Sequence, residues 1–315
     1  MFRLRLIPDK TNIPFMNGRN IGLAVSAILS TISVILFFFP GLYLGIDFKG
    51  GVLIELRTPQ AAQFDTLRST IGGLGLGEVG LQEYGSSQDV LIRLEQQPGG
   101  EDAQQRAVAR VRETIDKNFP GSEIRRVEAV GATVSDELYR AGMVAMGLAL
   151  AAMLGYIAFR FQWPFGVGAV TTLILDVTKL VGVYVLLRFQ FNLDSIAAIL
   201  TVMGFSINDK VVVYDRMREN LRKYKTMPLR QLIDVSINET LNRTVNTSLT
   251  VFLSTLPLVF GGEAVREFAL IILIGIVIGT SSSIFIAAPI LLYLGEGRLR
   301  RGVAPPKDDD KDKLP

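Results

Sequence analysis

The stretch LDSIAAILTVMGFSINDKVVVY, residues 193–214, is long and apolar enough to cross a membrane as a single helix. Its second half contains two adjacent charged residues, Asp209 and Lys210, followed directly by three valines. A charged side chain at the centre of a membrane-spanning helix costs about 2.5–3.5 kcal/mol on insertion scales. Because charges kept at that cost commonly mark proton or substrate pathways, this stretch indicates a membrane protein with a functional site inside the membrane.

Other apolar runs of similar length lie on both sides of this stretch. The first of them is too long for the core of a signal peptide and lacks a small-residue cleavage pattern after it, so we expect it to stay in the membrane. The sequence therefore predicts a polytopic α-helical membrane protein with six transmembrane helices. The predicted spans are residues 20–39, 138–159, 165–187, 193–214, 244–260 and 267–294.

Basic residues gather beside three of these spans. The short loops on the opposite side, residues 188–192 and 261–267, carry one arginine each. Since cytoplasmic loops are enriched in Lys and Arg, we expect both termini, residues 1–19 and 295–315, to be cytoplasmic, and the charged tail to be disordered. The basic residues are Arg3, Arg5, Lys10 and Arg19; Arg216, Arg218, Arg222, Lys223, Lys225 and Arg230; and Arg298, Arg300 and Arg301.

Composition limits the chemistry. The 315 residues include no cysteine and no histidine, which excludes disulfides, thiolate chemistry, His-based triads and zinc sites built from those ligands. Proton transfer near neutral pH would therefore fall to carboxylates or lysines. We expect no enzymatic activity, no metal or cofactor other than protons as a coupling ion, and, at a net charge of +3, no nucleic-acid partner.

The segment between the first two spans, residues 41–137, has the composition of a soluble domain on the external, periplasmic side. Its alternating and helical patterns follow the order β-α-β-β-α-β, which is that of a ferredoxin-like domain. The Gly-rich segment 71–80 fits no phosphate-binding loop, because no Lys-Ser/Thr follows it. The predicted strands lie in 48–57, 78–84, 89–95 and 122–130, with helices in 61–71 and 101–119.

Several blocks resemble one known family in order and spacing. GIDFKGG, residues 45–51, is similar to a G-x-D-F-x-G-G signature. FRFQWPFGVGAV (159–170), FNLDSIAAILTVMGFSINDKVVVYDRMRENLR (191–222) and LNRTVNTSLTVFLSTLPLVFGG (241–262) resemble blocks from the third to the fifth span. In this respect the chain resembles the SecF type of the SecD/SecF family of protein-export membrane proteins, in the resistance-nodulation-division superfamily.

The chain departs from the family pattern in three places. In VGATVSDEL, residues 130–138, Ala132 and Ser135 replace a Pro and a Gly. Leu175 stands before Asp176 where the family often has a His, and Lys210 follows Asp209 where it usually has a Thr. The last two differences concern the charged groups inside the membrane.

The resemblance implies a subunit of the Sec machinery in the bacterial inner membrane. Such a subunit works with SecD and uses the proton motive force to promote late translocation of preproteins. The implied partners are SecD, the SecYEG channel with SecA, YajC, the preprotein on the periplasmic side and the lipid bilayer. The alternatives are a proton-coupled small-molecule exporter of the same superfamily and a passive scaffold of the translocon.

Asp209 and Arg243 are the predicted proton relay. Asp209 lies roughly 7 Å from the cytoplasmic end of its span, and Arg243 begins the next span at a similar depth. The two side chains can therefore meet, with Thr247 and Ser248 nearby. Burial favours the neutral acid and the arginine favours the anion, so small helix shifts would load and release a proton. The resemblance implies the same relay; the alternative is a structural ion pair.

Asp176, Lys179 and Lys210 form the predicted supporting charge network. Asp176 and Lys179 can pair within one helix at i, i+3. Because side chains lean toward the N-terminus of a helix, Lys210 points toward mid-membrane, and we expect it to pair with Asp176 on the third span. The alternative is that Lys210 extends to the cytoplasmic interface. The predicted spans contain two acids and three bases, which suggests that a second subunit supplies an acid.

Weaker patterns indicate structure rather than chemistry. We expect two rows of small residues, one at Ala141, Ala145 and Ala149 and one at Gly275, Gly279 and Ser283, to mark close helix contacts. Asp47 and Lys49 are expected to shape the turn that leads into the first strand.

The proposed Lys210–Asp176 pair leads to a prediction. Lys210→Met should lower thermal stability, because removing one member of a buried pair typically costs about 3–5 kcal/mol. Asp176→Asn combined with Lys210→Met should recover much of that loss. The measurement is the midpoint of thermal unfolding in detergent. Additive losses in the double variant, or an unchanged Lys210→Met protein, would contradict the pairing.

Overall fold

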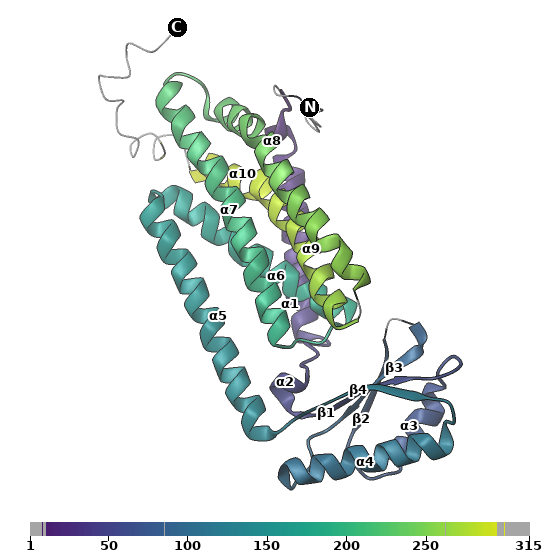
Figure 1. Cartoon of the computed structure of the whole chain (residues 1–315). Coiled ribbons are helices and arrows are strands. Elements are labelled where there is room, and N and C mark those ends of the chain that lie inside the picture. The colour runs from purple at the N-terminus through teal and green to yellow at the C-terminus, as the bar shows by residue number, and fades with distance from the viewer. Residues whose placement is uncertain (1–7, 9–10, 85, 262, 295–298, 300–315) are drawn as a thin grey trace. The chain divides into compact units, whose positions relative to one another are not determined.

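Long apolar helices make up most of the chain (Figure 1). A computed structural model describes residues 8, 11–84, 86–261, 263–294 and 299. The predicted tail 295–315 and the basic residues Arg3, Arg5 and Lys10 lie outside the described residues, apart from position 299. Contacts divide the chain into two units, one formed by Tyr43–Gly147 with Gln190–Ile196 and one by the remainder.

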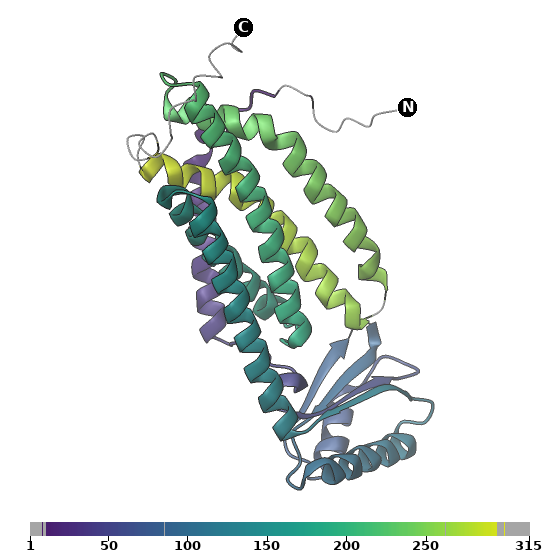
Figure 2. The ribbon, with the colours of Figure 1, turned by 60° about the vertical axis from the view of Figure 1, so that its left-hand side comes forward.

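The helical unit contains α1 (Arg19–Phe38), α6 (Trp163–Leu187), most of α7 (Leu193–Lys223), α8 (Leu229–Thr255) and α9 (Glu263–Ser282). Helix α9 continues through a π-helical segment, η3 (Ser283–Ala287), into α10 (Ala288–Leu294). Helix α5 (Ala132–Arg160) belongs to both units. In Figures 1 and 2, α8 and α9 run side by side.

Five helical segments in the described residues are long and apolar enough to cross a membrane. They are Arg19–Phe38, Ala132–Arg160, Trp163–Leu187, Leu193–Lys223 and Val265–Leu294. They correspond to five of the predicted spans. Helix α5 begins before the predicted span 138–159, and helix α7 ends beyond the predicted span 193–214. Helix α7 thus continues beyond residue 214 as far as Lys223.

The span predicted at 244–260 is not among these five segments. Helix α8 begins already at Leu229, and its first half carries polar and charged side chains, among them Asp234, Asn238 and Glu239. Its α-helical part ends at Thr255 and is followed by a short 3₁₀ helix, η2 (Leu256–Phe260). The apolar part of α8 is therefore only its second half.

Small residues let the helices approach closely. A Cβ atom added to Gly275 of α9 would lie 2.4 Å from a methyl carbon of Val202 on α7, and one on Gly279 would lie 3.1 Å from Cβ of Ser206. The contact predicted for the row that contains Gly275 and Gly279 is thus confirmed. The row at Ala141 and Ala145 is exposed, so the contact expected there is wrong within this chain.

The other unit is built around a four-stranded antiparallel sheet. Its strands have the order β2-β3-β1-β4, with every neighbouring pair antiparallel. The elements follow one another in the predicted order. They are β1 (Gly51–Arg57), α3 (Phe64–Gly72), β2 (Val79–Tyr84), β3 (Ser86–Leu94), α4 (Gly100–Asn118) and β4 (Glu123–Val130).

Helices α3 and α4 lie on one face of this sheet (Figure 1). Alternate residues of β1 and β3 point toward the helices and are almost completely buried, since strand side chains alternate between faces. The core they form with the helices contains Val52, Ile54, Leu56, Val90, Ile92 and Leu94 from the strands and Leu67, Ile71, Ala107, Val111 and Ile115 from the helices.

The entry into the sheet differs from the prediction. A one-turn helix, α2 (Ile46–Lys49), takes up residues expected at the start of a strand, and β1 begins at Gly51. Gly51 has a φ of 112°, and a Cβ atom there would lie 2.4 Å from the carbonyl oxygen of Leu94. Only glycine fits this combination of conformation and contact, which explains the second glycine of the pair.

The core of the sheet predicts that residues 45–131 fold when expressed alone. They should be soluble, show a mixed α/β circular dichroism spectrum and unfold cooperatively. Ile92→Ala should cost about 2–5 kcal/mol in this fragment, because Ile92 is fully buried against the helices. Leu53→Ala is the matched control on the opposite face of β1 and should cost less. A disordered spectrum, or equal losses in both variants, would contradict this account.

Candidate intramembrane charge site

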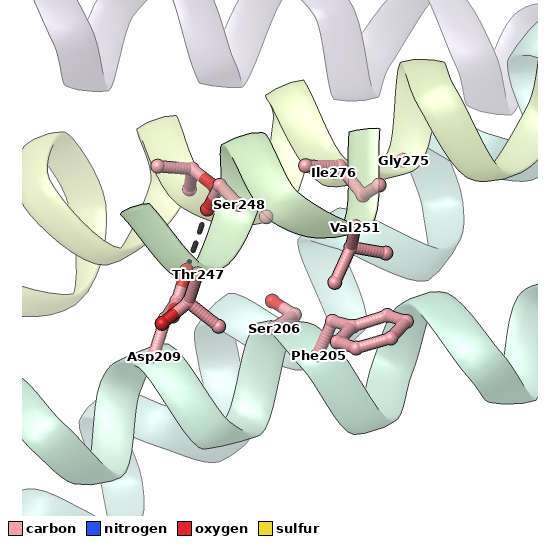
Figure 3. A pocket seen from close by; sticks show the side chains of 10 residues that line it. Phe205, Ser206, Asp209, Thr247, Ser248, Val251, Gly275 and Ile276 are labelled. Atoms are coloured by element: carbon pink, nitrogen blue, oxygen red, sulfur yellow. Dashed lines mark hydrogen bonds between the residues drawn. The ribbon is translucent and has the colours of Figure 1, made fainter. Parts of the chain in front are cut away.

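Asp209 lies on α7 and faces α8 and α9. Its side chain is almost fully buried. Two hydroxyl groups lie near its carboxylate. The hydroxyl of Thr280 on α9 donates to Asp209 Oδ2 at 3.4 Å, and the hydroxyls of Ser248 and Thr280 lie 2.7 Å apart. Figure 3 shows Asp209 pointing toward Thr247 and Ser248 of α8. The carboxylate thus meets hydroxyl groups from two other helices.

A small cavity of about 10 Å³ lies beside this carboxylate. Its walls come from all three helices, and its polar groups are Ser206 and Asp209 of α7, Thr247 and Ser248 of α8, and Thr280 of α9. Its volume is at the lower limit of the room that one water molecule requires. Hydroxyl groups and a water-sized space are what proton transfer to or from a carboxylate would require, whereas a cavity of this size has no room for a drug-sized molecule.

Helical periodicity brings these residues together. Ser206 and Asp209 are three positions apart on α7 and lie on one face, and Gly275 and Gly279 are four apart on the side of α9 that faces α7. The glycines remove the side chains that would separate α9 from α7. Close approach of the two helices is what brings Thr280 within reach of Asp209.

The predicted ion pair between Asp209 and Arg243 is not formed between these two residues, both of which the structure describes. Arg243 is exposed, and its carbonyl accepts a hydrogen bond from the hydroxyl of Thr247 at 2.8 Å, one turn further along α8. Asp209 lies level with Thr247 and Ser248 rather than with Arg243. The prediction misjudged the relative depth of the two helices by about one turn, or roughly 5.4 Å.

Asp176 forms the centre of a second buried cluster. Lys210 Nζ donates to Asp176 Oδ2 at 3.0 Å, and Lys179 Nζ lies 3.5 Å from Oδ1. The hydroxyls of Ser206 and Ser282 donate to Oδ2 at 2.8 Å and 2.7 Å. Buried polar groups are stable when they are hydrogen-bonded, and these donors from α6, α7 and α9 satisfy the carboxylate.

The predicted pairing of Lys210 with Asp176 is therefore present in the structure. The side chain of Lys210 is 1% exposed, so it does not extend to the membrane surface. Its ammonium group also contacts the hydroxyls of Ser206 and Ser282. Because Lys179 shares the same acid, Asp176→Asn with Lys210→Met leaves Lys179 without that partner, and complete recovery of stability also requires Lys179→Met.

Ser206 connects the two clusters. It lines the cavity beside Asp209 and also donates to Asp176. Ser282, which donates to Asp176 as well, is the last residue of α9 before the π-helical segment η3. π-helical turns inside α-helices often occur at functional sites.

Some residues of the site were missed in the sequence. Thr280, Ser206 and Ser282 were not identified as partners of the two acids, whereas Thr247 and Ser248 were expected near Asp209. The available signal was the presence of Ser and Thr side chains within apolar helices, close to the small residues that mark helix contacts. Among the residues that the structure describes, no group of three or more potential ligands could hold a metal ion.

Comparisons with known proteins identify the family of the chain. The family described as "Protein export membrane protein SecD/SecF, C-terminal" matches residues 110–297, and "SecD/SecF GG Motif" matches residues 35–62. The protein translocase subunit SecF of Rickettsia bellii is 44% identical over 306 residues, which cover 96% of this chain and 99% of that protein.

Two longer proteins are also similar. The protein translocase subunit SecDF of Brucella abortus is 41% identical over 93% of this chain, which corresponds to 38% of that protein. The crystal structure of SecDF, a translocon-associated membrane protein from Thermus thermophilus, superposes with a TM-score of 0.83 at 33% identity. That match covers 93% of this chain and 40% of the SecDF chain. With a family match over more than half of its length and a relative that matches nearly all of it, this chain belongs to the SecD/SecF family of protein export membrane proteins.

Proposed function

We propose that this chain is a subunit of the Sec protein-export machinery that promotes late translocation of preproteins across the inner membrane by using the proton motive force. The observation that carries the proposal is the buried Asp209 carboxylate beside a water-sized cavity between three helices. The similarity of nearly the whole chain to translocase subunits named SecF supports protein export as its function. We infer a transport component rather than an enzyme.

The proton-coupled step rests on Asp209. An anionic carboxylate inside a membrane protein is stabilised only by donors, and here the hydroxyls of Thr280 and Ser248 are the available ones. A protonated carboxyl group no longer needs both donors and can itself donate. Loading and release of a proton would therefore change which hydrogen bonds join α7, α8 and α9, and with them the packing of these helices.

Arg243 is the proposed second member of the relay. In the present arrangement it is exposed, one turn before Thr247. A shift of α8 relative to α7 by about one turn would bring Arg243 level with Asp209. Pairing with the arginine would then favour release of the proton, whereas burial without that cation favours its retention.

The six-span topology is proposed with α8 as the additional span. Five spans alone would put the two termini on opposite sides of the membrane. The basic residues that flank the spans favour the same, cytoplasmic side for both termini, and this requires a sixth crossing by α8 and η2. The sheet unit would then be periplasmic, as a ferredoxin-like domain within residues 41–137, and its order β2-β3-β1-β4 supports that assignment.

SecD is the proposed partner within the membrane. The similar SecDF proteins of Brucella abortus and Thermus thermophilus are longer single chains, of which this chain matches 38% and 40%. Two lysines share the single acid Asp176, and an acid from SecD would compensate the additional positive charge. We further propose the SecYEG channel with SecA, YajC and the emerging preprotein as partners.

Replacing Asp209 tests the coupling. Asp209→Asn should insert and assemble normally, because the amide keeps the shape and can still accept a hydrogen bond from Thr280. It should abolish the acceleration of export by a proton gradient, since the amide cannot carry a proton. The measurement is export of a stalled preprotein into inner-membrane vesicles. Asp194→Asn, an exposed substitution on the same helix, is the control. Normal acceleration in Asp209→Asn would favour the scaffold alternative.

Arg243→Gln tests the second member of the relay. The side chain is exposed and makes no ion pair with Asp209 in the structure, so the free energy of unfolding should change by less than about 0.5 kcal/mol. Export in the presence of a proton gradient should nevertheless slow to the rate without one. A variant that is unchanged in both stability and export would remove Arg243 from the relay.

A further inference from the structure

The loop before α7 is bound to the segment that follows α1. The amide of Phe191 donates to the carbonyl of Tyr43 at 2.7 Å, and the amide of Gly45 donates to the carbonyl of Phe191 at 3.0 Å. A parallel β-bridge joins Leu44 to Phe191. We call residues 43–47 together with residues 190–195 the clamp; all of them belong to the same unit.

Asp47 attaches the clamp directly to α7. Its Oδ2 accepts a hydrogen bond from the backbone amide of Leu193, the first residue of α7, at 3.0 Å. The first amides of a helix have no partner within the helix, and a carboxylate near them is stabilising. Asp47 therefore caps a helix that begins 146 positions later in the chain.

The clamp is also closely packed. A Cβ atom on Gly45 would lie 1.4 Å from Oδ1 of Asn192, so no other residue fits at position 45 without displacing that side chain. The ring of Phe48 lies 5.9 Å from that of Phe191 and 5.7 Å from that of Tyr139. The first glycine and the phenylalanine of GIDFKGG thus serve this contact.

The two sides of the clamp lead to different parts of the molecule. Residues 46–49 form α2 and continue through Gly50 and Gly51 into β1 of the sheet. Residues 193 onward form the continuous helix α7, on which Asp209 lies about 24 Å further along. A displacement of α7 along its axis would therefore act on the start of the sheet through Asp47 and the backbone hydrogen bonds.

We infer that Asp47 is a positioning residue that transmits movement of α7 to the external domain by holding the first turn of that helix. This inference rests on the proposed function, because it assumes that proton loading at Asp209 moves α7. The required property of Asp47 is a side-chain oxygen that accepts from the Leu193 amide. The charge is secondary, because Asn caps helices about as well as Asp.

The test compares two substitutions of similar size. Asp47→Asn keeps the acceptor and should retain most of the acceleration of preprotein export by a proton gradient in membrane vesicles. Asp47→Leu removes the acceptor and should lose that acceleration, with export in the absence of a gradient unchanged. Asp194→Leu, which removes the exposed acid next to Leu193 but leaves the contact between Asp47 and the Leu193 amide in place, is the control. Equal behaviour of Asp47→Asn and Asp47→Leu would overturn the inference.

A covalent rescue separates transmission from a general loss of stability. The chain has no cysteine, and a Cβ atom on Gly45 would lie 2.4 Å from Cγ of Asn192, so Gly45→Cys with Asn192→Cys places two thiols together. Introduced into Asp47→Leu, this pair should restore the acceleration when oxidised and lose it again on reduction. Asn192→Cys alone, which adds no side chain at position 45, serves as the control. No restoration by the disulfide would show that the clamp does not transmit the movement.

Failure of this inference is distinguishable from failure of the proposed function. Proton coupling at Asp209 is wrong, whatever Asp47 does, if a proton gradient does not accelerate export by the unsubstituted protein. It is also wrong if a gradient accelerates export by Asp209→Asn as much as by the unsubstituted protein. If Asp209→Asn loses the acceleration and Asp47→Leu keeps it, the relay stands and only the clamp is rejected.

Discussion

The burial of two carboxylates inside the helical unit is the constraint on which the rest of the structure depends. A buried charge is tolerated only where donors surround it, and those donors must come from several helices. Asp176 is held by two lysines and two serines from α6, α7 and α9. Asp209 has the hydroxyl of Thr280 and a small cavity beside it. Asp176 thus joins three helices, whereas Asp209 has fewer bonds to break, as the proposed proton exchange would require.

These contacts are possible because small residues line the helix interfaces. Gly275 and Gly279 allow α9 to approach α7, and Gly182 allows α6 to approach Ser33 of α1. In a membrane the association of helices depends on close packing and on hydrogen bonds between them, since lipid tails are as apolar as the side chains. Close packing brings the hydroxyls of Thr280 and Ser282 to the acids, so packing and charge burial support each other.

The sheet unit is stabilised by a different force. Its sheet buries alternate apolar residues against α3 and α4, in the manner of a water-soluble domain. The clamp at its entry uses backbone hydrogen bonds and the Asp47 carboxylate, which an apolar side chain could not replace. Loops are commonly the mobile parts of a protein, but the loop before α7 is fixed at both its backbone and its side chains.

The sequence by itself determined the positions of five long apolar helices, the order of strands and helices in the sheet unit, and the buried charged residues Asp176, Lys179, Asp209 and Lys210. Hydropathy and periodicity are local properties, so they locate elements reliably. The direction in which a helical side chain leans was enough to pair Lys210 with Asp176. The depth of α8 relative to α7 is not a local property, because close packing against α9 sets it. Only the tertiary structure therefore placed Thr280 rather than Arg243 beside Asp209, and only it joined Asp47 to a helix far along the chain.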